Sequence, residues 1–167
     1  MATQLNLNQI KENVQTFLQD ANTATADAYL SESMVTPVQS ILKTNPERIR
    51  PDATDFPFIT VFITGKNIEK QDMSRNDAIG KRWGTVQLRL VAGVWNDSYK
   101  NRDEDPADNE IEYLMENIEL VLRNQDNFLA GNTTIQTPGN VEYFTHMMEE
   151  ENHLRVGVMD YEVKLLY

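Results

Sequence analysis

The longest regular pattern in the chain is the stretch KRWGTVQLRLVAGVWND, residues 81–97, in which polar and apolar side chains alternate. Successive side chains of a β-strand point to opposite faces, so this period of two predicts a strand. One face of that strand is aliphatic, and the other carries Arg89 and both tryptophans of the chain, Trp83 and Trp95. The fold must therefore contain a sheet, with the aliphatic face packed on helices.

A second strand is predicted at DFPFITVFITG, residues 55–65, where β-branched and aromatic residues alternate after Pro57. Both of its faces are apolar, which is typical of a central strand. The polar segment that follows leads directly into residues 81–97. Two long strands joined in this way predict an extended hairpin.

Two amphipathic helices are predicted on either side of these strands. Residues 7–20 place apolar side chains at helical spacing, with Asn6 or Asn8 as the N-cap. The second helix begins at Asp105 and Pro106, because an acidic cap followed by proline is typical of a helix start, and it ends near Arg123.

The last third of the chain predicts two or three antiparallel strands. Residues 133–137 and 141–148 are separated by a predicted turn at Pro138-Gly139-Asn140, and residues 153–167 follow an acidic turn. In that last segment the apolar residues shift from even positions (154, 156 and 158) to odd positions (161, 163 and 165). Such a shift by one residue predicts a β-bulge near residues 157–160.

This order of elements predicts one α+β domain over residues 1–167. Its sheet is mainly antiparallel, has about four to five strands and is packed by two main helices. Residues 22–54 form a long N-terminal arm or loop, in which three prolines limit regular structure apart from a short helical piece near residues 38–42.

The charge is unevenly distributed along the chain. The formal net charge is -11, and all of the excess acidity lies after residue 100. Tight binding of nucleic acid depends on lysine and arginine contacts to phosphate, so direct DNA binding is disfavoured. The chain has no cysteine, which excludes thiolate zinc sites and cysteine nucleophiles. We expect neither a secretion signal nor a membrane span.

The sequence predicts no catalytic, cofactor or metal site. His146 and His153 are the only histidines, and their spacing fits no zinc or acid-base motif. Carboxylates near residue 105 match part of a calcium loop, but Pro106 occupies the position that requires glycine. We therefore expect a protein that is not an enzyme.

The polar and aromatic residues that form no catalytic or metal site are instead candidates for contacts between subunits. The basic residues of segment 66–82 alternate with acids, which fits either a solvated loop or a contact surface. The two tryptophans lie on one side of the strand but about 40 Å apart when fully extended, too far to stack on one ligand. Tryptophan is enriched in protein interfaces. The candidate contact residues are Lys66, Lys70, Arg75, Lys81, Arg82, Trp83, Arg89 and Trp95.

The order of these segments resembles the tail terminator, or tail-completion, proteins of tailed bacteriophages. The segments that carry the resemblance are FPFITVF, GTVQLRLVAGVW, NEIEYLMENIELVLR, NFLAG and VMDYEVKLLY, within residues 55–167. Residues 22–54 are longer than the family pattern.

The resemblance implies a structural virion protein at the head-tail junction, assembled in the host cytoplasm. It implies a ring-shaped homo-oligomer, usually a hexamer, that caps the tail tube, stops its polymerisation and offers a surface to a neck or head-completion protein. DNA would pass through the lumen without specific binding, and an acidic lumen would let it slide. Segments 65–82 and 22–54 would contact neighbouring subunits or the tube. The alternatives are another head-tail connector or neck subunit, a stand-alone ligand-binding module and an unrecognised enzyme.

Overall fold

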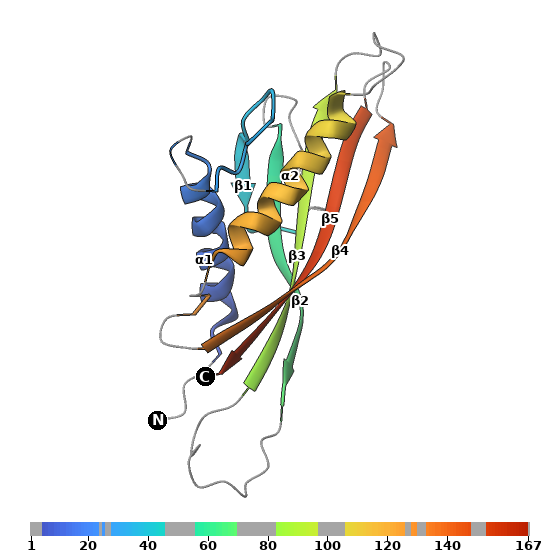
Figure 1. Ribbon diagram of the computed structural model, residues 1–167. Coiled ribbons are helices and arrows are strands. Elements are labelled where there is room, and N and C mark those ends of the chain that lie inside the picture. The colour runs from blue at the N-terminus through green and yellow to red at the C-terminus, as the bar shows by residue number, and fades with distance from the viewer. Residues whose placement is uncertain are drawn as a thin grey trace, which may run out of the picture.

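Over the residues that the structure describes, the chain folds into two helices and one five-stranded sheet (Figure 1). The computed structural model describes residues 5–23, 25, 28–45, 56–69, 83–96, 106–125, 128–129, 133–147 and 153–166. The elements are α1 (Leu7–Ala21), β1 (Ser40–Leu42), β2 (Phe58–Ile68), β3 (Trp83–Asn96), α2 (Pro106–Arg123), β4 (Thr133–Met147) and β5 (His153–Leu166).

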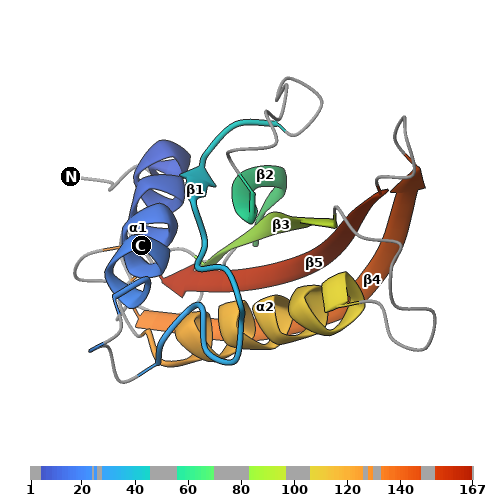
Figure 2. The ribbon, with the colours of Figure 1, turned by 90° about the horizontal axis from the view of Figure 1, so that it is seen from above.

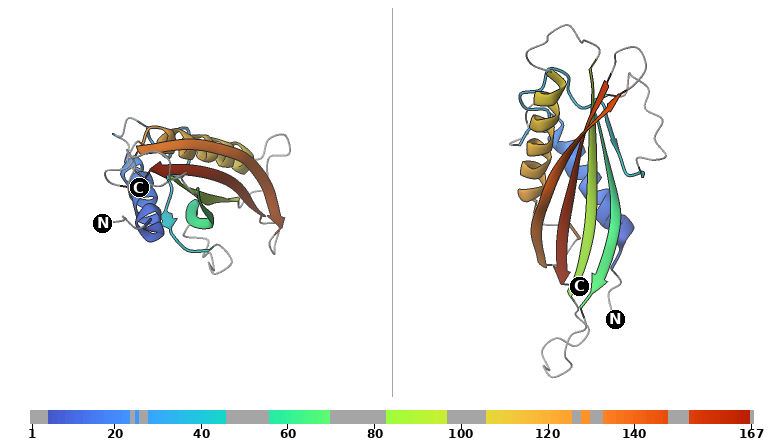
Figure 3. Two further views of the ribbon diagram at one scale, coloured as in Figure 1. Left: turned by 90° about the horizontal axis from the view of Figure 1, so that it is seen from below. Right: turned by 90° about the vertical axis from the view of Figure 1, so that its right-hand side faces the viewer.

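The sheet has the strand order β1-β2-β3-β5-β4. Strand β1 runs parallel to β2, and every other neighbouring pair is antiparallel. The right-hand view of Figure 3 shows the four long strands side by side. The predicted α+β class, with a mainly antiparallel sheet and two main helices, is confirmed.

The core lies between the helices and one face of the sheet. Seen from above, α1 lies beside β1 and β2, whereas α2 runs along β5 and β4 (Figure 2). The predicted aliphatic face of β3 is buried here, with Leu88 and Leu90 fully buried. Helix α2 approaches β5 closely at Gly157, where an added Cβ would lie 2.6 Å from Met115 Cγ. Glycine at this position therefore sets how closely the helix packs on the sheet.

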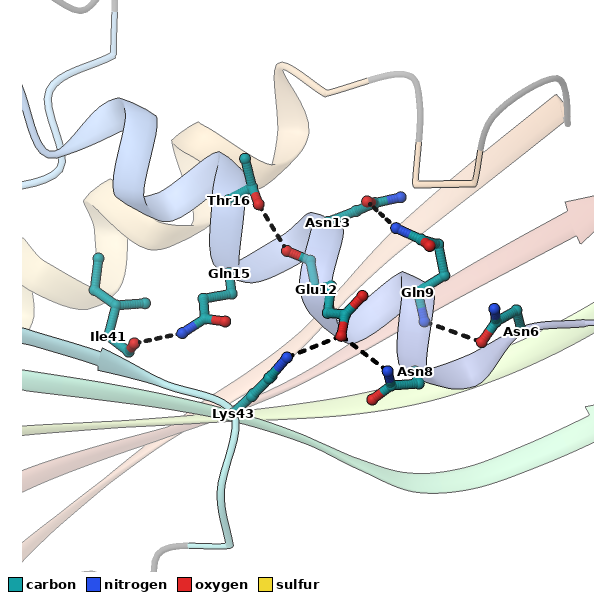
Figure 4. A network of polar contacts seen from close by, with 9 residues as sticks. All are labelled: Asn6, Asn8, Gln9, Glu12, Asn13, Gln15, Thr16, Ile41 and Lys43. Carbon is teal, nitrogen blue, oxygen red and sulfur yellow. Dashed lines mark hydrogen bonds and ion pairs between the residues drawn. The ribbon is translucent and has the colours of Figure 1, made fainter.

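Helix α1 is capped and tied to β1 by polar side chains (Figure 4). The Gln9 amide donates to Asn6 Oδ1 at 3.1 Å, so Asn6 is the N-cap. Gln15 Nε2 donates to the carbonyl of Ile41 at 2.7 Å, and Lys43 Nζ lies 2.9 Å from Glu12 Oε1. Hydrogen bonding to Lys43 lowers the pKa of Glu12. These contacts fix the helix against the parallel edge of the sheet.

Helix α2 begins at Pro106 and ends at Arg123, as the sequence predicts. It buries Ile111, Leu114 and Ile118 fully. Asp105, the predicted cap, lies outside the described residues.

The predicted turn at residues 138–140 is wrong, because β4 continues through it as one strand. The pairing with β5 shifts there instead, from Pro138 opposite Tyr161 to Val141 opposite Met159. The bulge also lies on β4 and not on β5, which pairs with β3 without a shift. The buried residues of β5 keep one parity, since Gly157, Met159 and Tyr161 all face the core, whereas the apolar Val156 and Val158 lie on the opposite face.

The short helical piece predicted near residues 38–42 is also wrong, because residues 40–42 form β1. The amides of Gln39 and Ser40 donate to the carbonyl of Pro57, which draws this segment onto β2. Within the described part of segment 22–54, Leu30 and Val38 are buried in the core. Whether the segment acts as an arm toward other subunits stays a prediction.

Strands β2 and β3 pair antiparallel from Phe58 opposite Gly93 to Ile68 opposite Gly84. The connection between them lies outside the described residues, so the extended hairpin stays a prediction.

A matched pair of substitutions on α2 tests the position of the core. Leu114 is fully buried, whereas Leu120 is 46% exposed. We expect Leu114→Ala to lower the free energy of unfolding by about 2–5 kcal/mol, because it leaves a cavity. Leu120→Ala should change it by less than about 1 kcal/mol. Urea unfolding at pH 7 measures both, and equal losses would contradict this assignment of the core.

Candidate functional site

The face of the sheet that points away from the helices is the candidate functional site, and we call it the open face. It is formed by the alternate residues of β2 to β5 that do not enter the core. At its centre, Phe62 and Arg89 are paired across β2 and β3, and Arg89 and Asp160 across β3 and β5. Three strands distant in sequence therefore place their side chains together.

Arg89 and Asp160 form a two-pronged ion pair on the open face. Arg89 Nε lies 2.7 Å from Asp160 Oδ1, and Arg89 Nη2 lies 2.9 Å from Asp160 Oδ2. Hydrogen bonding to Arg89 lowers the pKa of Asp160, and the same contact raises the pKa of Arg89. Both side chains remain exposed, at 42% and 57%, so the pair is open to a partner.

A groove of about 700 Å³ surrounds this ion pair. Its walls combine apolar side chains with polar ones, and Phe144 on β4 is 50% exposed. The groove is lined by Asn45, Phe62, Arg89, Val91, Asn140, Glu142, Phe144, Val158 and Asp160. A surface with apolar walls and a central ion pair is suited to contact another molecule.

An aromatic cluster lies at the end of the open face near the start of β2. The ring centroid of Phe56 lies 5.2 Å from that of Phe58 and 5.5 Å from that of Trp95. Gly93 makes room for this cluster, because an added Cβ would lie 2.3 Å from the Phe58 ring.

A second charged and aromatic group lies at the opposite end of β3. Lys164 Nζ lies 5.3 Å from the ring centroid of Trp83 and 2.6 Å from Glu69 Oε1. The two tryptophans therefore mark opposite ends of one face and do not form one stacking platform.

The predicted contact residues fall into three groups. Trp83, Arg89 and Trp95 belong to the open face by the alternation along β3. Lys66 is exposed on β2. The remaining four lie outside the described residues: Lys70, Arg75, Lys81 and Arg82.

Sequence reasoning missed Asp160, Phe62 and Phe144 as members of this face. The alternation along β2 already placed Phe62 on the face opposite to Val61 and Ile63, and this could have identified Phe62 as a residue of the open face. Asp160 and Phe144 carried no such signal, because the predicted bulge left the face of Asp160 undefined and the alternation along residues 141–148 was assigned to no face.

The solvent side of α2 is acidic. Glu112 and Glu116 are exposed there, and Arg123 is the only basic residue of the helix. Both carboxylates act on Tyr143 of β4, whose pKa is raised by burial and by these two charges. The acidic side of α2 therefore adjoins β4.

Within the described residues, no group of three histidine, cysteine, aspartate or glutamate side chains could hold a metal ion. The side chains of His146 and His153 are not among those described. No helix in the described ranges is long and apolar enough to cross a membrane.

A scan against protein-family models finds no match to this chain, and a search of curated protein sequences finds none either.

The Arg89–Asp160 pair predicts a small pH dependence of stability. Folding lowers the pKa of Asp160 below its ordinary value of 3.8. The ion pair therefore adds to the free energy of unfolding above about pH 5, and this stabilisation is lost as the pH falls through the folded pKa. Because both groups are exposed, Asp160→Asn should cost less than about 1 kcal/mol at pH 7.

Urea unfolding between pH 7 and pH 2 measures the effect. Glu162→Gln, on the same face of β5, controls for the loss of one carboxylate. A difference between Asp160→Asn and the native chain that stays constant down to pH 2 would contradict the assignment.

Proposed function

We propose that this chain is the subunit of a ring that caps the tail tube of a tailed bacteriophage, stops tube polymerisation and joins the tail to the head. The observation that carries the proposal is that helices cover only one face of the sheet. Both helices pack on one face, whereas the open face keeps Phe144 half exposed beside the exposed Arg89–Asp160 pair. Exposed apolar residues gathered around polar ones are typical of a surface that becomes buried in assembly.

The order of elements supports the same function. The resemblance to tail terminators rests on a helix, two long strands, a second helix and a closing pair of strands, and α1, β2, β3, α2, β4 and β5 follow in that order. The tail tube protein and a neck or head-completion protein are the proposed partners, in a virion assembled in the host cytoplasm.

The acidic side of α2 is proposed to line the lumen of the ring. Glu112 and Glu116 are exposed on it. Carboxylates repel phosphate and release no counterions from DNA, so the genome would pass without being held.

A stand-alone ligand-binding module is the second candidate, and the groove is the observation that favours it. Phe62, Val91 and Phe144 offer apolar contacts there, and Arg89 and Asp160 offer fixed polar ones. A neck subunit with the same fold is a third candidate, which differs from a terminator only in its partner.

Electron microscopy of the purified protein with and without tail tubes tests the proposed function. We expect rings at tube ends and tubes of uniform length. Phe144→Glu should reduce the fraction of capped ends about tenfold or more, because it buries an unpaired carboxylate in a contact. Leu120→Glu, an equally exposed apolar residue on α2, is the matched control and should cap normally.

Protein that never binds tube ends would exclude the terminator function. Binding to isolated heads alone would favour the neck subunit. A monomer that binds a small molecule in the groove would favour the ligand-binding module.

Reversing charge on α2 tests the lumen. We expect Glu112→Lys with Glu116→Lys to give rings that still cap tubes but retain linear DNA in a salt-dependent way. Filter binding measures the retention. Asp20→Lys with Glu32→Lys makes the same net change at exposed positions elsewhere. Equal retention by both variants would contradict a lumen lined by α2.

A further inference from the structure

Strand β4 is an edge strand with one side unpaired among the described residues. It is 15 residues long, and within the described residues its backbone pairs with β5 alone. The bulge after Pro138 interrupts it, which leaves residues 141–147 as an unbroken stretch. An exposed edge of this length presents a row of free backbone donors and acceptors to another strand.

Pro138 and the bulge after it protect the first part of this edge, whereas residues 141–147 carry no proline and no lysine, and Glu142 is their only carboxylate. Seven large apolar side chains are exposed in the described parts of the chain, and three of them are on β4: Ile135, Tyr143 and Phe144. Natural edge strands that face only water usually carry charges, particularly lysine. Strand β4 therefore has the composition of an edge that is covered in an assembly.

A second open edge lies on β2. Strand β1 pairs with β2 only at Phe58–Thr60, so the described residues leave 61–68 unpaired on that side, with a shift of the β2–β3 register between Ile63 and Gly65. Figure 1 shows this end of β2 extending away from both helices. Ile68 is 39% exposed there.

The two edges match in direction. Strand β2 is antiparallel to β3, β3 to β5, and β5 to β4, so β2 and β4 run in opposite directions within one subunit. A second copy in the same orientation would bring its β2 antiparallel to β4 of the first. This contact is heterologous, and such contacts form closed rings when their rotation closes.

Charge favours this partner over a symmetric pairing of β4 with itself. Glu142 lies on β4, and Glu112 and Glu116 act on Tyr143 of the same strand. A two-fold contact through this stretch would bring the acidic groups of both copies close together, which is unfavourable. The open stretch of β2 carries Lys66 and no carboxylate.

We propose that residues 141–147 of β4 pair with residues 61–68 of β2 in the next copy of the chain, so that the sheet continues from subunit to subunit. The inference rests on the proposed function, since it requires a chain that assembles with copies of itself.

Cross-linking tests the contact, because the native chain has no cysteine. Thr145→Cys on β4 and Thr64→Cys on β2 both replace exposed threonines. The two variants are mixed in equal amounts, with and without tail tubes, and treated with a short bismaleimide. We expect a covalent dimer from the mixture at about tenfold or more the yield of either variant alone, because pairing raises the effective concentration. The double variant, which carries both cysteines in one chain, should give a ladder of covalent oligomers.

The control mixture contains Thr16→Cys in place of Thr145→Cys, because Thr16 is an exposed threonine on α1. The proposal is overturned if the mixture of Thr145→Cys and Thr64→Cys gives no more covalent dimer than the control mixture. It is also overturned if Thr145→Cys alone gives as much dimer as the mixture. A chain that stays monomeric and unlinked at millimolar concentration and on tubes also overturns it. Capped tubes without the cross-link reject only the strand contact, whereas the cross-link without capping rejects only the ring-cap function.

Discussion

The pairing of β3 with β5 is the interaction on which the rest of the structure depends. The two strands stay in one register over their full length, from Trp83 opposite Leu166 to Asn96 opposite His153. Because side chains alternate, this one register sends Leu88 and Tyr161 into the core and Arg89 and Asp160 to the open face. A slip of one residue would exchange the two faces.

The inner face of this pair explains how the helices pack. Gly157 lets α2 approach β5, and Tyr161 closes the core with its hydroxyl donating to Gln136 of β4. Burial raises the pKa of Tyr161 to about 12, so the phenol stays neutral across the physiological range. Among the described residues no helix packs on the outer face, where the Arg89–Asp160 pair stays exposed, and this asymmetry connects the fold with the proposed assembly.

Local signals predicted much of this architecture. The caps and apolar spacing of α1 and α2 involve residues near in sequence, and alternation was sufficient to find β2 and β3. The errors at residues 38–42, 138–140 and 157–160 share one cause. Each of these segments takes its conformation from pairing with another strand: β1 from β2, and the β4 bulge from its pairing with β5.

The sequence by itself determined the α+β class, both helices, the buried face of β3 and the placement of Trp83, Arg89 and Trp95 on the opposite face. These properties depend on periodicity and capping, which act within one segment. Only the tertiary structure decided that Arg89 meets Asp160, 71 residues away, and that β4 is an edge with Phe144 exposed. Strand order and register arise from non-local hydrogen bonds and packing, which no single segment encodes.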